Sequence, residues 1–133
     1  MSNRNWTVGI LATGAITKMR VEGKSFIDDA HELLGSDMFE RVRLSENLSM
    51  IVDESGLIKG LPDNKIASRL YGTHIHGAPI VGDAFMCSED YVEEDGFWEL
   101  DLVWLTEEQA DELILFFPEF LKRQTAFLER END

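Results

Sequence analysis

Residues 50–86 read MIVDESGLIKGLPDNKIASRLYGTHIHGAPIVGDAFM. This stretch holds two of the three prolines and half of the ten glycines, and each of its apolar runs is short. Glycine adopts backbone conformations that other residues avoid, whereas proline fixes its own φ and lacks an amide donor. The stretch is therefore predicted to form a tight bend that the flanking strands and helices hold in place.

Alternation of apolar and polar side chains predicts strands on both sides of this bend. Residues 6–13 and 16–22 alternate around a glycine and predict a β-hairpin, and residues 39–53 predict a second one. A further strand is expected at residues 79–86. The clearest alternation runs from residue 97 to residue 104, where Trp98, Leu100, Leu102 and Trp104 share one side.

Capping residues mark the expected helices. Ser25 opens an apolar stripe of helical spacing that Gly35 ends, and a shorter helix starts at Asp63 or Asn64 and ends at Gly72. Near the end of the chain, Thr106 and Gln109 have the spacing of a capping box, in which each side chain bonds the backbone of the other. A C-terminal helix is expected to follow.

Together these elements predict an α+β fold, with an antiparallel or mixed sheet of about five or six strands, helices on one face and a C-terminal helical extension. We expect two parts: a core domain at residues 1–105, and an acidic helical extension at residues 106–133 that packs on or beside the core. The apolar stripe of that extension could pair with another copy of the chain, so a homodimer is also expected.

The net charge of −14 is concentrated in the last third of the chain. Residues 1–87 carry 11 acidic and 9 basic side chains, whereas residues 88–133 carry 15 acidic and 3 basic ones. Such a surface repels nucleic acids and anionic membranes, and it attracts a basic protein groove, including one that normally holds DNA. Solubility alone is the simpler interpretation.

The acidic residues fall in a loop expected at residues 88–96 and in the first turns of the C-terminal helix. The candidate protein contacts are Glu89, Asp90, Glu93, Glu94, Asp95, Glu107, Glu108, Asp111 and Glu112.

Three motifs lie in or next to the predicted bend: Gly60-Leu61-Pro62-x-Asn64, Ala67-Ser68-x-Leu70-Tyr71-Gly72 and Ile80-Val81-Gly82-Asp83-Ala84. In this order they resemble the signature of a family known as domain of unknown function 3846, whose members occur largely in bacteriophages, plasmids and other mobile elements. The resemblance covers residues 6–86. It implies a phage or mobile-element origin and no particular activity. Residues 73–78 and the acidic helical C-terminus depart from the family pattern.

The turn at residues 60–64 opens a helix, whose first N–H groups could hold an anion or a nucleotide phosphate. Asp63 competes for these donors as a cap. The structural interpretation, a fixed chain reversal with apolar residues plugging the core, is the stronger one. The candidate ligand-binding residues are Lys59, Gly60, Asn64, Ser68, Arg69 and Tyr71.

His74-x-His76 is the one spacing that suits a metal, because alternate residues of a strand face the same way, with Asp83 or Cys87 as a third ligand. Two histidines without a fixed further partner are more often exposed loop residues. Cys87 has no orienting group for nucleophilic catalysis, and no phosphate-binding glycine motif is present. No catalytic residue and no cofactor are therefore assigned.

The leading hypothesis is a non-enzymatic phage or mobile-element accessory protein that binds a host protein, such as a defence protein, through its acidic C-terminal third. The alternative is a small-molecule or nucleotide-signal binding protein, a sponge, that uses residues 60–72. No apolar run is long enough to span a membrane, and the single cysteine excludes an intrachain disulfide. We expect a cytoplasmic protein, in the host cell if phage-encoded, without direct binding to membrane or nucleic acid.

Overall fold

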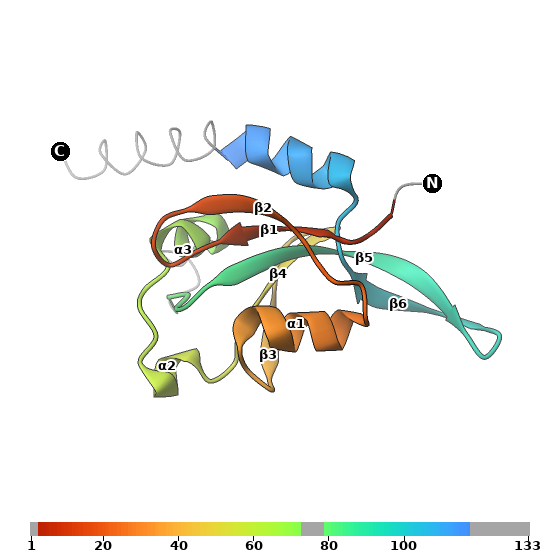
Figure 1. The fold of residues 1–133 in the computed structure, drawn as a ribbon, viewed down its shortest axis with the longest axis horizontal. Helices are drawn as coiled ribbons and strands as arrows, with labels where there is room; N and C mark the ends of the chain where they lie inside the picture. Colours follow the sequence, from red (N-terminus) through yellow and green to blue (C-terminus); the bar gives the residue numbers. More distant parts are fainter. Residues whose placement is uncertain (1–2, 73–78, 118–133) are drawn as a thin grey trace.

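A computed structural model describes residues 3–72 and 79–117 of the chain (Figure 1). Within them, six strands form one sheet in the order β2-β1-β5-β4-β3, with β6 also paired to β5. All neighbouring strands run antiparallel. The strands are β1 (Trp6–Ile10), β2 (Ile16–Arg20), β3 (Phe39–Ser45), β4 (Leu48–Asp53), β5 (Ala84–Glu94) and β6 (Phe97–Val103). The predicted α+β class and the size of the sheet are confirmed.

The helices are α1 (Phe26–Leu34), α2 (Gly56–Lys59), α3 (Lys65–Tyr71) and a C-terminal helix that begins at residue 107 and is described through residue 117. Ser25 caps α1, because its Oγ accepts from the Asp28 amide at 3.1 Å. The predicted capping box is complete: Thr106 N donates to Gln109 Oε1 at 3.0 Å, and Gln109 N donates to Thr106 Oγ1 at 3.2 Å. No described helix has the length and apolar character that a membrane crossing requires.

The helices lie on both faces of the sheet rather than on the one face expected (Figure 1). Met50 and Val52 of β4 belong to the core cluster beneath α3 and the C-terminal helix, which contributes Ala110 and Phe117. Ile51, between them in sequence, belongs to the cluster beneath α1. A central strand buried on both sides needs cover on both sides, and this explains the second layer of helix.

The acidic residues that follow Cys87 continue strand β5, so the prediction of a loop at residues 88–96 is wrong. The long strand β5 continues to Glu94 and pairs with β6 from Ser88↔Val103 to Glu94↔Phe97. Asp95 and Gly96 form the two-residue turn between them with φ of 53° and 83°, as in a type I′ hairpin. We call residues 88–103 the β5–β6 arm. It projects from the body of the molecule (Figure 1).

Candidate functional site

The predicted bend folds back on the segment that leads into β5. Asn64 N donates to Ile80 O at 2.8 Å, and Gly82 N donates to Pro62 O at 2.7 Å. Gly82 has a φ of 75°, and a Cβ placed on it would lie 2.8 Å from Leu61 Cδ1. The backbone conformation therefore favours glycine at this position, and any larger residue would also force the Leu61 side chain to shift.

The side chain of Asn64 joins three parts of the structure. It is fully buried, and its Nδ2 donates to Ile10 O at 2.7 Å and to Gly82 O at 2.8 Å. Its Oδ1 accepts from Ala67 N at 3.0 Å and so caps α3. Both amide hydrogens are used within the fold. Asn64 therefore has no donor left for a ligand in this conformation.

Other candidate ligand-binding residues also bond within the fold. Ser68 Oγ accepts from Ile80 N at 2.9 Å, and Lys59 Nζ donates to Asp53 Oδ2 at 2.7 Å. Gly60 ends α2 with a φ of 70°. Arg69 and Tyr71 lie on α3 and are half-buried. Asn64 and Ser68 thus meet at the segment before β5, whereas Lys59 and Gly60 belong to α2 and Lys59 bonds to Asp53. Ligand binding by the candidate residues stays a prediction.

The two candidate metal ligands, His74 and His76, lie outside the described residues. Within the described ranges, no group of three or more histidine, cysteine or acidic side chains is arranged to hold a metal ion. Cys87 is buried in the sheet, and this burial raises the pKa of its thiol to about 12. Its sulfur is therefore protonated, and not nucleophilic, at neutral pH.

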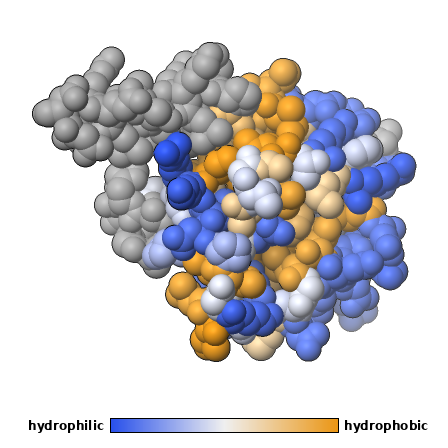
Figure 2. Space-filling model, turned by 60° about the vertical axis from the view of Figure 1, so that its left-hand side comes forward, coloured by the Kyte–Doolittle hydropathy of each residue, from blue (hydrophilic) through white to orange (hydrophobic). Residues whose placement is uncertain are grey.

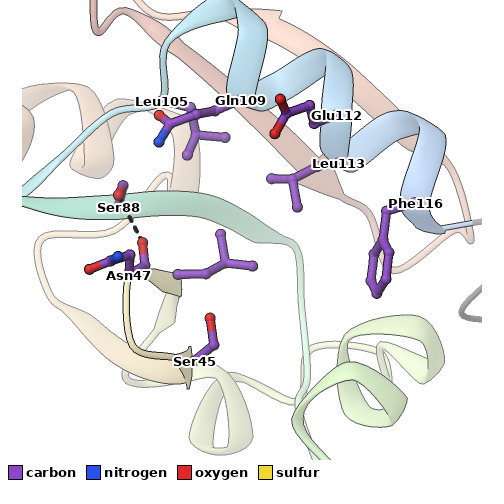
Figure 3. Close-up of a pocket in the computed structure, with 9 residues that line it drawn as sticks. Ser45, Asn47, Ser88, Leu105, Gln109, Glu112, Leu113 and Phe116 are labelled. Carbon is purple, nitrogen blue, oxygen red and sulfur yellow. Dashed lines mark hydrogen bonds between the residues drawn. The ribbon is translucent and has the colours of Figure 1, made fainter.

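A hollow of about 470 Å³ lies between β5, the β3–β4 turn and the C-terminal helix (Figure 3). Leu113 and Phe116 extend from the helix toward it, and Glu112 lies at its helical side. Ser88 Oγ donates to Asn47 O at 2.8 Å across its floor. The hollow is mainly apolar, and none of the candidate ligand-binding residues lines it. A smaller hollow of about 160 Å³ beside Asp53, Tyr71 and Ile80 is the one that borders the bend.

The candidate protein-contact residues differ in whether their carboxylates form ion pairs. Glu89 has a side chain only 4% exposed and accepts from both Arg41 and Arg43 at 2.8 and 2.7 Å. Lys18 Nζ forms ion pairs with both Glu107 and Asp111, at 2.8 and 2.7 Å.

One further acid is loosely paired: Asp90 lies 3.4 Å from Arg4. Glu108 lies in the first turn of the C-terminal helix. Among the described residues, no ion pair forms at Glu93, Glu94, Asp95 or Glu112. The unpaired negative charge is therefore densest at the tip of the β5–β6 arm.

The strand register gives the two faces of the arm different chemistry. Tyr91 lies opposite Leu100 and Glu93 opposite Trp98, so Tyr91, Trp98 and Leu100 share one face with Glu93, and we call this the apolar face. Tyr91, Trp98 and Leu100 are 64%, 65% and 52% exposed. The opposite face, which we call the acidic face, also carries Val92 and Phe97. Its acids are Asp90, Glu94, Glu99 and Asp101.

The sequence did not indicate that the apolar face is exposed. Alternation at residues 97–104 predicted a strand whose apolar side chains share one side, and Leu102 and Trp104 do pack in the core beneath α1. Trp98 and Leu100 lie farther out along the arm, beyond the cover of α1, which packs on β3 and β4. Apolar surface is also found in separate areas elsewhere, as on the side shown in Figure 2. Outside the arm, the exposed apolar residues include Leu57 and Ile58 of α2.

A model of one protein family, described as a domain of unknown function (DUF3846), matches residues 10–114. The chain belongs to this family. The comparison with curated proteins finds no match, and the comparison with solved structures finds none either. The DUF3846 match extends past residue 86, where the resemblance was expected to end. It includes the β5–β6 arm and the first turns of the C-terminal helix, so the arm is part of the DUF3846 domain.

The motifs that identify the DUF3846 domain make contacts within its own fold. Asn64, Ser68 and Gly82 hold the bend against the segment before β5, as described above. Asp83 Oδ1 accepts from Ala12 N at 2.8 Å, next to the end of β1. The contacts of these motifs therefore stabilise the fold itself.

Replacement of Asn64 by alanine is expected to destabilise the protein by about 3 kcal/mol or more, because two buried carbonyls and one amide lose their partner. Urea unfolding followed by tryptophan fluorescence measures this loss. Asp63→Ala is the matched control: Asp63 is the exposed neighbour, and its loss should change stability by about 0.5 kcal/mol at most. Equal effects of the two substitutions would contradict the role assigned to Asn64.

The Asp53 carboxylate gives a pH prediction. Burial raises its pKa, but hydrogen bonds from Lys59, Ser55 N and Ser36 outweigh that effect and hold the pKa below its usual 3.8. Because the folded-state pKa is the lower one, Asp53 stabilises the fold above about pH 3.8 and loses this effect as the pH falls through the folded-state pKa.

Lys59→Met removes the strongest of these bonds and leaves the burial, so the pKa of Asp53 should rise and acid unfolding should begin at higher pH. NMR titration of the carboxyl carbon measures the pKa. Lys65→Met, at an exposed lysine of α3, should leave it unchanged. An unchanged Asp53 pKa in Lys59→Met would show that Lys59 does not stabilise the carboxylate.

Proposed function

We propose that this protein is a non-enzymatic accessory protein of a phage or mobile element that binds a basic protein of the host. The observation that carries the proposal is the β5–β6 arm, which projects from the sheet (Figure 1), with Tyr91 and Trp98 exposed on one face and most of its acids on the other. The family membership supports a mobile-element origin through the resemblance noted above. The remaining support comes from charge and exposure.

The charge of the arm has one sign. Residues 88–103 contain no lysine or arginine, and the acids near the tip form no ion pair with described residues. Complementary charge raises the rate of association and selects the partner more than it adds affinity. A partner surface rich in lysine and arginine would be drawn to the acidic face.

The aromatic residues of the arm can contribute binding energy, which complementary charge alone supplies only weakly. Trp and Tyr are enriched among the residues that contribute most to binding energy, because they bury large areas with few rotatable bonds. Trp98 and Tyr91 are the exposed members of this class on the apolar face. An arm that combines them with acids can both attract a basic partner and hold it.

A protein groove that normally holds DNA fits this description, because it presents lysine and arginine to phosphates. Occupation of such a groove by the arm would exclude the nucleic acid. We therefore include inhibition of a host defence protein in the proposal. The nucleotide-sponge alternative has less support, because Asn64 and Ser68 already bond within the fold.

Charge reversal on the acidic face tests the proposal. Immobilised wild-type protein should capture a basic host protein at low salt and release it at high salt. The double variant Glu94→Lys/Glu99→Lys should reduce capture at least about tenfold, because like charges would then face each other.

The control is Glu46→Lys/Glu54→Lys, which changes the net charge equally at two exposed acids outside the arm and should capture normally. Failure to capture any basic protein at either salt concentration would refute the proposal. An equal loss in both double variants would mean that net charge, and not the arm, governs binding.

A further inference from the structure

No described strand pairs with the outer edge of β6. Within the described part of the chain, β6 pairs with β5 and with no other strand. Leu102 N donates to the carboxylate of Asp101 at 2.9 Å, so this amide points away from β5. Amides of one strand alternate in direction, and those of Trp98 and Leu100 therefore point to the same outer edge. A free edge of this kind can accept another strand.

The side chains beside this edge also alternate. Trp98 and Leu100 lie on the apolar face, whereas Glu99 and Asp101 lie on the acidic face. A strand added next to β6 would place its own side chains alternately beside these two sets. The best complement is a segment in which apolar and basic residues alternate.

We infer that the arm binds its partner by strand addition: an extended segment with alternating basic and apolar residues pairs with the outer edge of β6. This inference rests on the proposed function and adds to it the binding mode and the sequence pattern of the partner. Backbone hydrogen bonds hold the segment in register, its apolar residues cover Trp98 and Leu100, and its basic residues meet Glu99 and Asp101.

The other edge of the arm is less suitable. Residues of β5 beyond Ser88 also lack a neighbour on the side where β4 ends, but Arg41 and Arg43 reach Glu89 there. Both guanidinium groups are partly exposed and would repel a basic segment. Among the described residues, no basic side chain forms an ion pair with residues 97–103.

A second copy of the chain is also a poor occupant of the outer edge of β6, because its acids would repel those of the first copy. Two arms would bring Glu99 and Asp101 of each copy toward the same acids of the other, and like charges across adjacent strands are destabilising. A basic segment reverses the sign of that interaction. It also completes a three-stranded sheet, and a two-stranded ribbon alone is marginally stable in water.

The test uses two synthetic peptides of equal length and composition. In the first, lysine and valine alternate; in the second, the same residues are arranged in blocks of two. Binding to the full chain is followed by the fluorescence of the protein's tryptophans. We expect the alternating peptide to bind at least about tenfold more tightly, because only it can match both faces at once.

Leu100→Pro separates strand addition from side-chain contact. Leu100 lies opposite Tyr91 with its amide on the outer edge, so proline there removes an outer donor and leaves the β5–β6 ladder intact. Leu100→Ala removes most of the side chain and keeps the donor. We expect Leu100→Pro to bind the alternating peptide about tenfold more weakly than Leu100→Ala. Amide exchange of Val92 and Asp101 verifies that the ladder persists in both variants.

Equal binding by Leu100→Pro and Leu100→Ala would overturn strand addition, as would equal affinity for the two peptides. If both peptides bind equally and Glu94→Lys/Glu99→Lys abolishes their binding, charge recognition by the arm stands and strand addition fails. If neither peptide binds and no basic protein is captured, the proposed function fails together with this inference.

Discussion

The hydrogen bonds of the Asn64 amide hold together the part of the sheet that is paired least. β1 and β5 share only the pairs Gly9↔Phe85 and Ile10↔Ala84. Asn64 bonds the carbonyls of Ile10 and Gly82, which lie at the end of this short ladder, and caps α3 with its remaining oxygen. A buried side chain thus supplies the bonds that further strand pairing would otherwise make. The position of β5, and of the arm that continues it, depends on this contact.

The two ends of β5 differ in burial. Ala84 to Cys87 are buried between two layers of helix, and from Asp90 onward the same strand is exposed. At the boundary, Glu89 is buried against Arg41 and Arg43, which fixes the base of the arm to the edge strand β3. The family motifs build the buried half. The residues that we propose to contact a partner lie on the exposed half, where Tyr91, Trp98 and Leu100 share one face and most of the acids share the other.

Local signals in the sequence predicted much of the fold. The Thr106–Gln109 capping box, the Ser25 cap and the two hairpins depend on neighbouring residues, and all are present. The strand of residues 97–103 was also predicted, but the first half of the arm, residues 88–96, was taken for a loop because its run of acids outweighed the Asp95-Gly96 turn signal. Asn64 was recognised as a cap, but its bonds to Ile10 and Gly82 join distant parts of the chain. No local pattern indicates such contacts, nor the exposure of Trp98 beyond α1.

Native-state hydrogen exchange of the wild-type protein tests most directly the claim that a rigid bend supports an exposed arm. The amides of Asn64, Ala67 and Gly82 donate to Ile80 O, Asn64 Oδ1 and Pro62 O. We predict that they exchange only through global unfolding. The outward amides of Trp98 and Leu100 should exchange orders of magnitude faster. Exchange of the bend amides at the rate of the arm would contradict the account.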